Sequence, residues 1–201
     1  MFVQVIQGQV GDAGALRAAL DRWVAELAPT ATGWLGSTGG VTADGRGIAL
    51  ARFASAEDAR RNSERPEQGA WWAETSKAFR GEVTFHDSTD VLTAFDGGSD
   101  DAGFVQVIQG RTSDVERMRA LNTQVSDTLR EYRPDIIGWV VALHGDGGFT
   151  QAVYFRSEAA AREGERREPP PELKAQVEEE MALMSDATFF DLTDPWLHSP
   201  R

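Results

Sequence analysis

The sequence predicts an α+β protein built from two tandem copies of one β-α-β-β-α-β unit. The first observation is a repeat, because the seven residues FVQVIQG at 2–8 recur unchanged at 104–110. The second is that each copy alternates short β-branched runs with amphipathic helical patterns. This order is the ferredoxin-like motif, in which both helices cover one sheet face. Since a single copy would leave the other face bare, we expect the two sheets to pack together within the chain as one barrel.

Weaker identities carry the repeat through both halves. Gly33-Trp34 recurs as Gly138-Trp139, and Phe53 recurs as Phe155. The offset between copies changes where loops are expected, as it does when a duplicated sequence drifts. Between the copies lies a polar, Gly-rich stretch that is typical of a linker. We therefore divide the chain into repeat 1 (1–95), a linker (96–103) and repeat 2 (104–201).

Each copy opens with a strand and a helix. Residues 2–7 form a β-branched run that Gly8 ends, and Asp12 then suits a helix N-cap. Apolar residues follow at helical spacing up to Leu27, and Pro29 stands just past the expected end. In copy two, Asp114 or Ser113 takes the place of the cap.

A hairpin, a broken helix and a last strand complete each copy. Trp34 leads into a turn at 39–40 or 44–45, and the matching turn in copy two lies at 144–148. Ser55 and Ser157 suit the caps of the second helical region. Pro66 and the prolines at 169–171 should split that region into a short and a longer helix. The closing strands are expected at 83–87 and 187–191.

Composition narrows the functional classes. The 201 residues contain no cysteine, which excludes thiol nucleophiles, disulfides and thiolate zinc sites. The net charge of −12 disfavours nucleic acid and anionic membranes as partners. No apolar run reaches the about 18 residues of a spanning helix, and no secretory signal is visible. No two histidines have metal-ligand spacing. We expect a cytoplasmic protein with no metal and no cofactor.

Three segments carry a resemblance to a known family. They are the strand Phe2–Gly8, the pair Gly33-Trp34, and Phe53-Ala-Ser-Ala-Glu-Asp-Ala59, which copy two keeps in altered form as Phe155–Ala161. Together they resemble the dimeric α/β-barrel superfamily, and within it the antibiotic-biosynthesis-monooxygenase-like branch. The resemblance covers nearly all of both copies. It implies a barrel fold and a small apolar ligand between one sheet and its helices. The superfamily includes cofactor-free monooxygenases, haem-degrading enzymes, isomerases and stress proteins.

The resemblance implies a set of site residues in copy one. Two are candidate catalytic groups, His86 and Asn62. Four are candidate ligand-binding groups: Gln7, Trp34, Trp71 and Trp72. Haem degradation is disfavoured, because Gln7 replaces the family's asparagine and neither second helix has a histidine.

Structural roles are open for the same residues. Gln7 could satisfy its amide within the protein. One of Trp71 and Trp72 should enter the core while the other faces a cleft, because neighbouring helix positions point about 100° apart. His86 could be a surface residue.

Copy two lacks most of these side chains. Its aligned residues are Gly164, Leu173, Lys174 and Phe190. Aromatic rings with a few polar groups are typical of small-molecule sites, so we expect the ligand site in copy one.

Three functions fit these observations. The first is binding of a small apolar or aromatic molecule in the helix–sheet cleft of repeat 1. The second is a cofactor-independent monooxygenase that oxidises a phenolic or polyketide-type aromatic with O₂. The third is a non-catalytic structural or stress-related oligomer. The chain should form an intrachain pseudo-dimer, and further homo-oligomerisation is left open.

Overall fold

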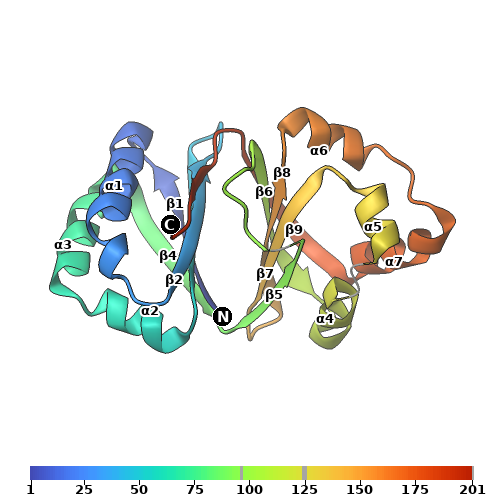
Figure 1. The fold of residues 1–201 in the computed structure, drawn as a ribbon, viewed down its shortest axis with the longest axis horizontal. Helices are drawn as coiled ribbons and strands as arrows, with labels where there is room; N and C mark the ends of the chain where they lie inside the picture. Colours follow the sequence, from blue (N-terminus) through green and yellow to red (C-terminus); the bar gives the residue numbers. More distant parts are fainter. Residues whose placement is uncertain (96, 124–125, 201) are drawn as a thin grey trace. The chain divides into compact units, whose positions relative to one another are not determined.

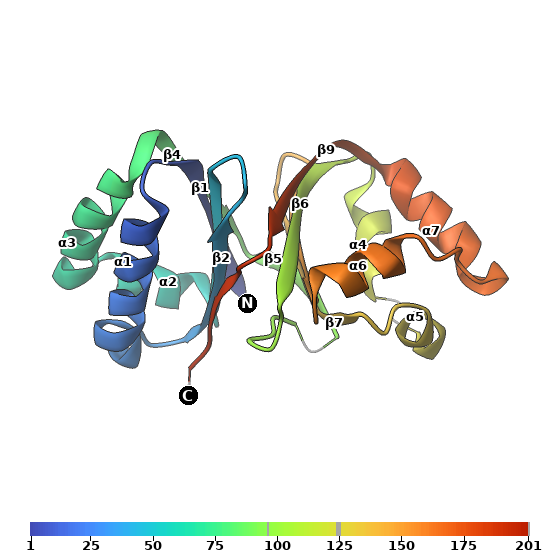
Figure 2. The same cartoon turned by 90° about the horizontal axis from the view of Figure 1, so that it is seen from above.

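A computed structural model describes residues 1–95, 97–123 and 126–200. The chain forms two compact units (Figures 1 and 2). Unit 1 comprises Met1–Thr89 and the C-terminal segment from Asp194 onward, and unit 2 comprises Asp90–Thr193.

Unit 1 is a five-stranded antiparallel sheet with helices on one face (Figure 1). The sheet order is β10-β2-β3-β1-β4. Its strands are β1 (Phe2–Val10), β2 (Trp34–Val41), β3 (Arg46–Phe53), β4 (Phe79–Ser88) and β10 (Trp196–His198). Its helices are α1 (Ala13–Glu26), α2 (Ala56–Ser63) and α3 (Pro66–Thr75), with 3-10 turns η1 (Ala28–Thr30) and η2 (Ser76–Ala78).

Unit 2 repeats this plan, with the sheet order β5-β7-β8-β6-β9. Its strands are β5 (Asp90–Ala94), β6 (Phe104–Thr112), β7 (Ile136–Leu143), β8 (Gly148–Phe155) and β9 (Met184–Leu192). Its helices are α4 (Val115–Thr123), α5 (Asp127–Tyr132), α6 (Glu158–Glu165) and α7 (Pro171–Leu183). They cover one face of its sheet (Figure 2).

The two sheets share one register. Phe2 pairs with Phe53 as Phe104 pairs with Phe155. This confirms tandem ferredoxin-like repeats in an α+β chain. The packing of one sheet on the other stays a prediction.

Each sheet has a fifth strand that the repeat did not predict. β5 lies at the end of repeat 1 but pairs with β7 in unit 2, and β10 lies at the end of repeat 2 but pairs with β2 in unit 1. The two units therefore do not coincide with the two repeats. The end of repeat 1, from Asp90, belongs to unit 2, and the end of repeat 2, from Asp194, belongs to unit 1. An unpaired edge strand exposes its backbone groups, and the exchanged strands pair the edges of β2 and β7.

The predicted linker is partly anchored in unit 2. Residue 96, its first position, lies outside the described residues. Gly97 and Ala102 are buried, and the Gly103 amide donates a hydrogen bond to Phe155 O at 3.0 Å. Just before the linker, Phe95 stacks on Trp139 with ring centroids 6.3 Å apart. The segment from 97 to 103 is therefore less exposed than its composition indicates.

Helix boundaries follow the signals in the sequence. Asp12 caps α1 by accepting from the Ala15 amide at 2.9 Å. Ser55 and Ser157 cap α2 and α6 in the same way. α3 and α7 begin at Pro66 and Pro171, which confirms the predicted breaks. The repeated caps place α2 and α6 equivalently in the two units.

Strand alternation decides which residues of β1 face the helices. Phe2 belongs to the core cluster that includes Trp23 of α1. Because successive side chains alternate, Gln4 and Ile6 also face the helices, while Gln7 lies on the opposite face. This assignment positions every candidate site residue on β1 and β4.

Candidate functional site

The six predicted site residues do not converge. Ile6 on the helix side pairs with Phe85, so their strand neighbours Gln7 and His86 both fall on the opposite face of the sheet. Trp34 instead contacts Trp23 of α1 on the helix side, with ring centroids 5.1 Å apart. The sheet therefore separates Gln7 and His86 from the tryptophans.

Within the described part of the chain, the side-chain amide of Gln7 lacks a hydrogen bond of the kind made by Gln4 on the same strand and by Gln109, its equivalent in copy two. Gln4 Nε2 donates to Asp87 Oδ1 at 2.9 Å, and Gln109 Nε2 donates to Thr150 Oγ1 at 3.1 Å. Gln7 Oε1 is buried and has no hydrogen-bond partner among the described residues. The expected internal hydrogen bond to this oxygen is therefore not made.

Asn62 is buried at the end of α2, where its side chain is hydrogen-bonded to Arg65. Its Oδ1 accepts from Arg65 Nη1 at 3.0 Å. Arg65 also donates to Leu27 O at 3.2 Å and to Thr30 Oγ1 at 2.7 Å. Arg65 thus ties the α2–α3 corner to the end of α1, and the Asn62 oxygen is engaged in that connection.

The charge at this corner is locally paired. Arg65 Nε donates to Glu67 Oε1 at 2.9 Å. The pKa of Glu67 is lowered from its ordinary value, first by a hydrogen bond from its own backbone and then by Arg65. Glu67 is therefore a poor candidate for a general acid.

Four tryptophans form a row along the helix side of unit 1. Trp34 contacts Trp23, Trp23 contacts Trp71 at 6.4 Å, and Trp71 contacts Trp72 at 6.1 Å. Trp71 Nε1 donates to Ala19 O at 2.8 Å, whereas Trp72 packs on Phe85 at the edge strand. Trp71 is thus the inner residue of the pair and Trp72 the outer one.

A small cavity lies beside Trp71 and Trp72. It has a volume of about 40 Å³, and its walls include Ile6, Phe79 and Trp196. A water molecule occupies about 30 Å³ of liquid, so this space does not hold an aromatic ring in the present conformation. The two tryptophans support the core here, and their predicted contact with a ligand stays a prediction.

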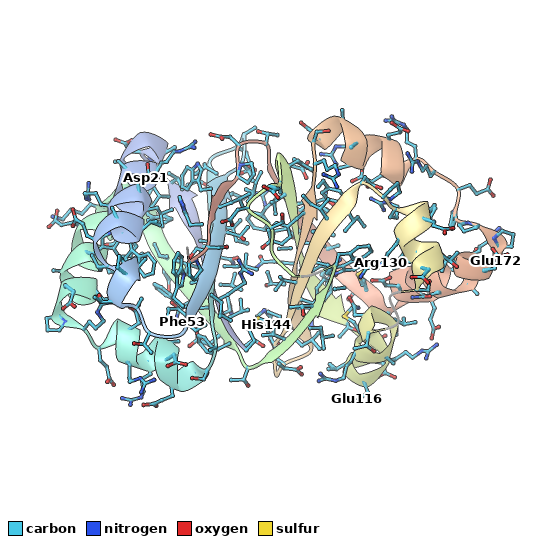
Figure 3. All side chains as sticks on the ribbon, viewed as in Figure 1. Asp21, Phe53, Glu116, Arg130, His144 and Glu172 are labelled. Atoms are coloured by element: carbon cyan, nitrogen blue, oxygen red, sulfur yellow. The ribbon has the colours of Figure 1, made fainter. Side chains whose placement is uncertain are left out.

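A larger groove lies between α1 and the C-terminal segment of unit 1. Its volume is about 650 Å³, which is within the range of roughly 300–1,000 Å³ that is typical of small-molecule sites. Trp34 and Asp21 line it. Figure 3 shows Asp21 on α1. Its other lining residues are short or aliphatic: Val24, Ala25, Ala28, Pro29, Ala31, Ser199 and Pro200. We call this space the α1 groove.

The C-terminal segment forms the second wall of the α1 groove. Trp196 and His198 pair with Gly39 and Ser37 of β2. Arg17 of α1 pairs with Asp194, and its guanidinium lies 5.8 Å from the centroid of the Trp196 ring. These contacts fix the wall to both α1 and the sheet.

Sequence reasoning missed this wall, although a signal for it exists. Asp87 and Asp90 align with Asp191 and Asp194 at one offset. Extending that alignment places Trp196 opposite Leu92, and both residues lie in fifth strands. The continued repeat therefore indicates a further strand after the closing strand that we predicted at 187–191.

The titratable groups at the groove are few. His198 Nε2 lies 3.9 Å from Asp21 Oδ1, which makes an ion pair when the histidine is protonated. Across the described ranges, no three His, Cys, Asp or Glu residues are grouped so as to hold a metal ion. Within the same ranges, no helix is both long and apolar enough to span a membrane.

Comparisons with known proteins support the architecture. The sequence matches no protein-family model and no curated protein. A "putative monooxygenase" from Fusobacterium nucleatum superposes with a TM-score of 0.76 at 9% identity, over 98% of this chain and 94% of that one. A "putative monooxygenase" from Lactobacillus acidophilus gives 0.70 at 13% identity, over 98% and 96%. The chain has the monooxygenase-like ferredoxin fold.

A third solved structure extends the comparison. An "anthrone oxidase-like protein" superposes with a TM-score of 0.60 at 12% identity, over 98% of this chain and 93% of that one. Since each of these three proteins matches the chain over nearly its whole length, the likeness includes both repeats. At these identities it is a likeness of fold, and a shared fold does not by itself determine activity.

Proposed function

We propose that this monooxygenase-like protein binds a small apolar or aromatic molecule in the α1 groove of unit 1. The groove itself is the observation that carries the proposal. Its floor includes Trp34, and its walls are mostly short aliphatic side chains that leave about 650 Å³ free. Apolar walls with a few polar groups at the edge are typical of small-molecule sites.

The surroundings of the groove favour binding over catalysis. Proton transfer needs an acid or base within hydrogen-bond reach of the substrate. His86 and Gln7 lie on the other sheet face, and the Asn62 oxygen is held by Arg65. None of these three offers the groove a reacting group.

A cofactor-free monooxygenase is the second candidate, because one histidine does stand at the groove. His198 lies beside Asp21, and a carboxylate next to an imidazole can orient it as a base. In that case His198, rather than His86, would deprotonate the substrate before its carbanion reduces O₂. Oxygen uptake with anthrones and hydroquinones tests this candidate, and it fails if His198→Gln leaves any observed uptake unchanged.

The binding proposal is tested with a neutral aromatic probe, N-phenyl-1-naphthylamine. Its fluorescence should rise on binding to the wild-type protein. Ala25→Phe fills the groove and should weaken binding at least about tenfold. Ala18→Phe is the matched control, since it makes the same change on the same stripe of α1, two turns away and outside the groove.

Two outcomes would overturn the binding proposal. The first is that the wild-type protein does not bind the probe. The second is equal binding to both phenylalanine variants, which would place the probe elsewhere on the chain.

The setting of this function is also part of the proposal. We infer that the protein acts in the cytoplasm, as its lack of cysteine and its net charge of −12 suggest. Cell fractionation followed by immunoblotting tests this, and recovery with membranes or outside the cell would contradict it.

A further inference from the structure

Asp21 places a carboxylate in the α1 groove that no arginine or lysine neutralises. It is the charged residue of the groove lining, and its side chain is 61% exposed, so a ligand can reach it. Among the described residues, its ion-pair contact is with His198, at 3.9 Å, which is longer than a hydrogen bond. Arg17, one helical turn earlier on α1, is instead paired with Asp194. The Asp21 oxygens are therefore available to accept hydrogen bonds from a ligand.

The end of α1 adds a second negative feature to the same groove. Ala25 lies four residues after Asp21, so the two share one stripe of the helix, and both line the groove. The Ala25 carbonyl lacks the donor that a continuing helix would supply, because Pro29 has no amide hydrogen. The C-terminus of a helix also carries a partial negative charge of about half an elementary charge. A positive group in the groove would be attracted by both features.

The aromatic wall of the groove suits a positive group as well. The N–H of Trp34 is used inside the protein, since Trp34 Nε1 donates to Ser37 Oγ at 3.1 Å. What the indole offers a ligand is therefore its ring surface, and indole is the aromatic side chain that binds cations best. No lysine, arginine or histidine lines the groove in the part of the chain that the structure describes. The lining thus attracts cations and has no side chain that would pair with an anion.

Unit 2 shows that the fold does not need a carboxylate at this position. Arg17 of α1 and Arg119 of α4 make the same ion pair, each to an aspartate at or just before the fifth strand of its own sheet. Four residues further on, Asp21 of α1 therefore corresponds to Thr123 of α4. The Thr123 hydroxyl donates to backbone carbonyls of its own helix. Since the equivalent helix has a neutral residue here, the charge of Asp21 calls for an explanation specific to unit 1.

We propose that the molecule held in the α1 groove is an amine with an apolar body, whose ammonium group binds Asp21. This inference rests on the proposed function. The ammonium donates charge-assisted hydrogen bonds to the carboxylate and lies near the negative end of α1. The apolar body packs against Trp34 and the short aliphatic walls. An organic acid of the same shape is disfavoured, because it would meet the same negative groups.

A pair of probes separates this inference from the proposed function. 2-Naphthylmethylamine, which is protonated at pH 7, and the neutral 2-naphthalenemethanol share one ring system and one linker and differ in charge. Calorimetry on the wild-type protein at low ionic strength should show the amine binding about fivefold more tightly, the scale of an ion pair with an exposed carboxylate. Added salt should reduce this preference. The anion 2-naphthoate should bind more weakly than either probe.

Two matched variants locate the preference. Asp21→Asn keeps the shape of the side chain and removes its charge, so the affinities for the amine and the alcohol should become equal. Glu26→Gln is the control, since it removes one negative charge from an exposed residue of the same helix outside the groove lining. This control should keep the preference for the amine.

Each result decides one statement. Equal affinity of the wild-type protein for the amine and the alcohol would overturn the role of Asp21 while the groove stands. So would an Asp21→Asn variant that keeps the preference, or an equal loss in Glu26→Gln, which would mean that the overall negative charge attracts the amine. If neither probe binds, or if Ala25→Phe weakens the binding of neither, the α1 groove itself is wrong. Should Asp21→Asn fail to fold, the two probes on the wild-type protein and on Glu26→Gln still decide the question.

Discussion

Trp71 and Trp72 are neighbours in the chain with different surroundings. Trp71 lies between Trp23 and Trp72 and donates to a backbone carbonyl of α1. Trp72 packs on Phe79 and on the exposed Phe85. The inner indole therefore connects a helix to the core, while the outer one covers the sheet edge.

This difference predicts unequal effects on stability. Trp71→Ala should destabilise the protein by about 3 kcal/mol, since it removes packing and leaves the Ala19 carbonyl without its donor. Trp72→Ala should cost about 1 kcal/mol, because its ring packs on Phe79 and Phe85 at the edge strand rather than against α1. Urea denaturation followed by circular dichroism measures both. Equal losses would contradict the assignment of inner and outer residues.

Asn62 is expected to act on stability rather than on binding. Asn62→Ala removes an acceptor of the Arg65 guanidinium and should cost about 1–3 kcal/mol. Binding of N-phenyl-1-naphthylamine should not change. If Asn62→Ala lost probe binding while keeping wild-type stability, Asn62 would instead belong to the ligand site.

At the scale of elements, the α2 N-terminus depends on an ionised carboxylate. Asp58 accepts from Ser55 Oγ at 2.6 Å, and it also pairs with Arg61. The pKa of Asp58 is lowered from 3.8, first by the Ser55 hydroxyl and then by Arg61. The stabilisation is thus present above pH ~4 and is lost as the pH falls below it.

Asp58→Asn tests this dependence. The variant should have a lower urea midpoint than the wild type at pH 7, and the gap should close toward pH 2.5. Asp100→Asn, an exposed change outside the helices, serves as the control. A gap that is the same at both pH values would show that the charge of Asp58 is not involved.

The fifth strand of unit 1 should matter for both folding and binding. Trp196 packs with Val10, Leu16 and Ala78, so Trp196→Ala should cost about 3 kcal/mol and weaken probe binding in the α1 groove. Leu92→Ala is the matched control in the fifth strand of unit 2. It should lower stability while leaving probe binding intact, as thermal melts and fluorescence titrations would show. Equal weakening by both variants would mean that the groove does not depend on β10.

Local signals were enough to predict most elements, but not which side chains meet. Asp12, Ser55 and Pro66 mark helix ends through contacts within a few residues, and the structure confirms them. Gln7 and His86 were expected in one site with Trp71, whereas the strand register places them on the other face of the sheet, because a shift of one residue reverses the face of a strand side chain. The pairing of β10 with β2 joins distant segments, and no local pattern encodes such a contact.

At the scale of the whole molecule, the strand exchange makes each half incomplete. Residues 1–95 lack β10, and residues 96–201 contain it. The fragment 1–95 should therefore not bind N-phenyl-1-naphthylamine, and adding the fragment 96–201 should restore binding. Independent binding by the first fragment would contradict the part that we give to the C-terminal wall.

The duplication also lets the two units differ in chemistry. Arg52 and Tyr154 occupy one position in two environments, and so do Asn62 and Gly164. In a dimer of identical chains both positions would have to change together. In a fused pair the two positions can change independently, so unit 1 can carry an arginine where unit 2 carries a tyrosine.

The strand exchange also sets an order of events during synthesis. Most of unit 1 leaves the ribosome first, but β10 is translated only after the whole of unit 2. A nascent chain therefore carries α1 and Trp34 for a long time without the second wall of the groove. Products of interrupted translation would include nearly all of unit 1 and still be unable to capture a ligand, so competence for binding would report that the second repeat has been made.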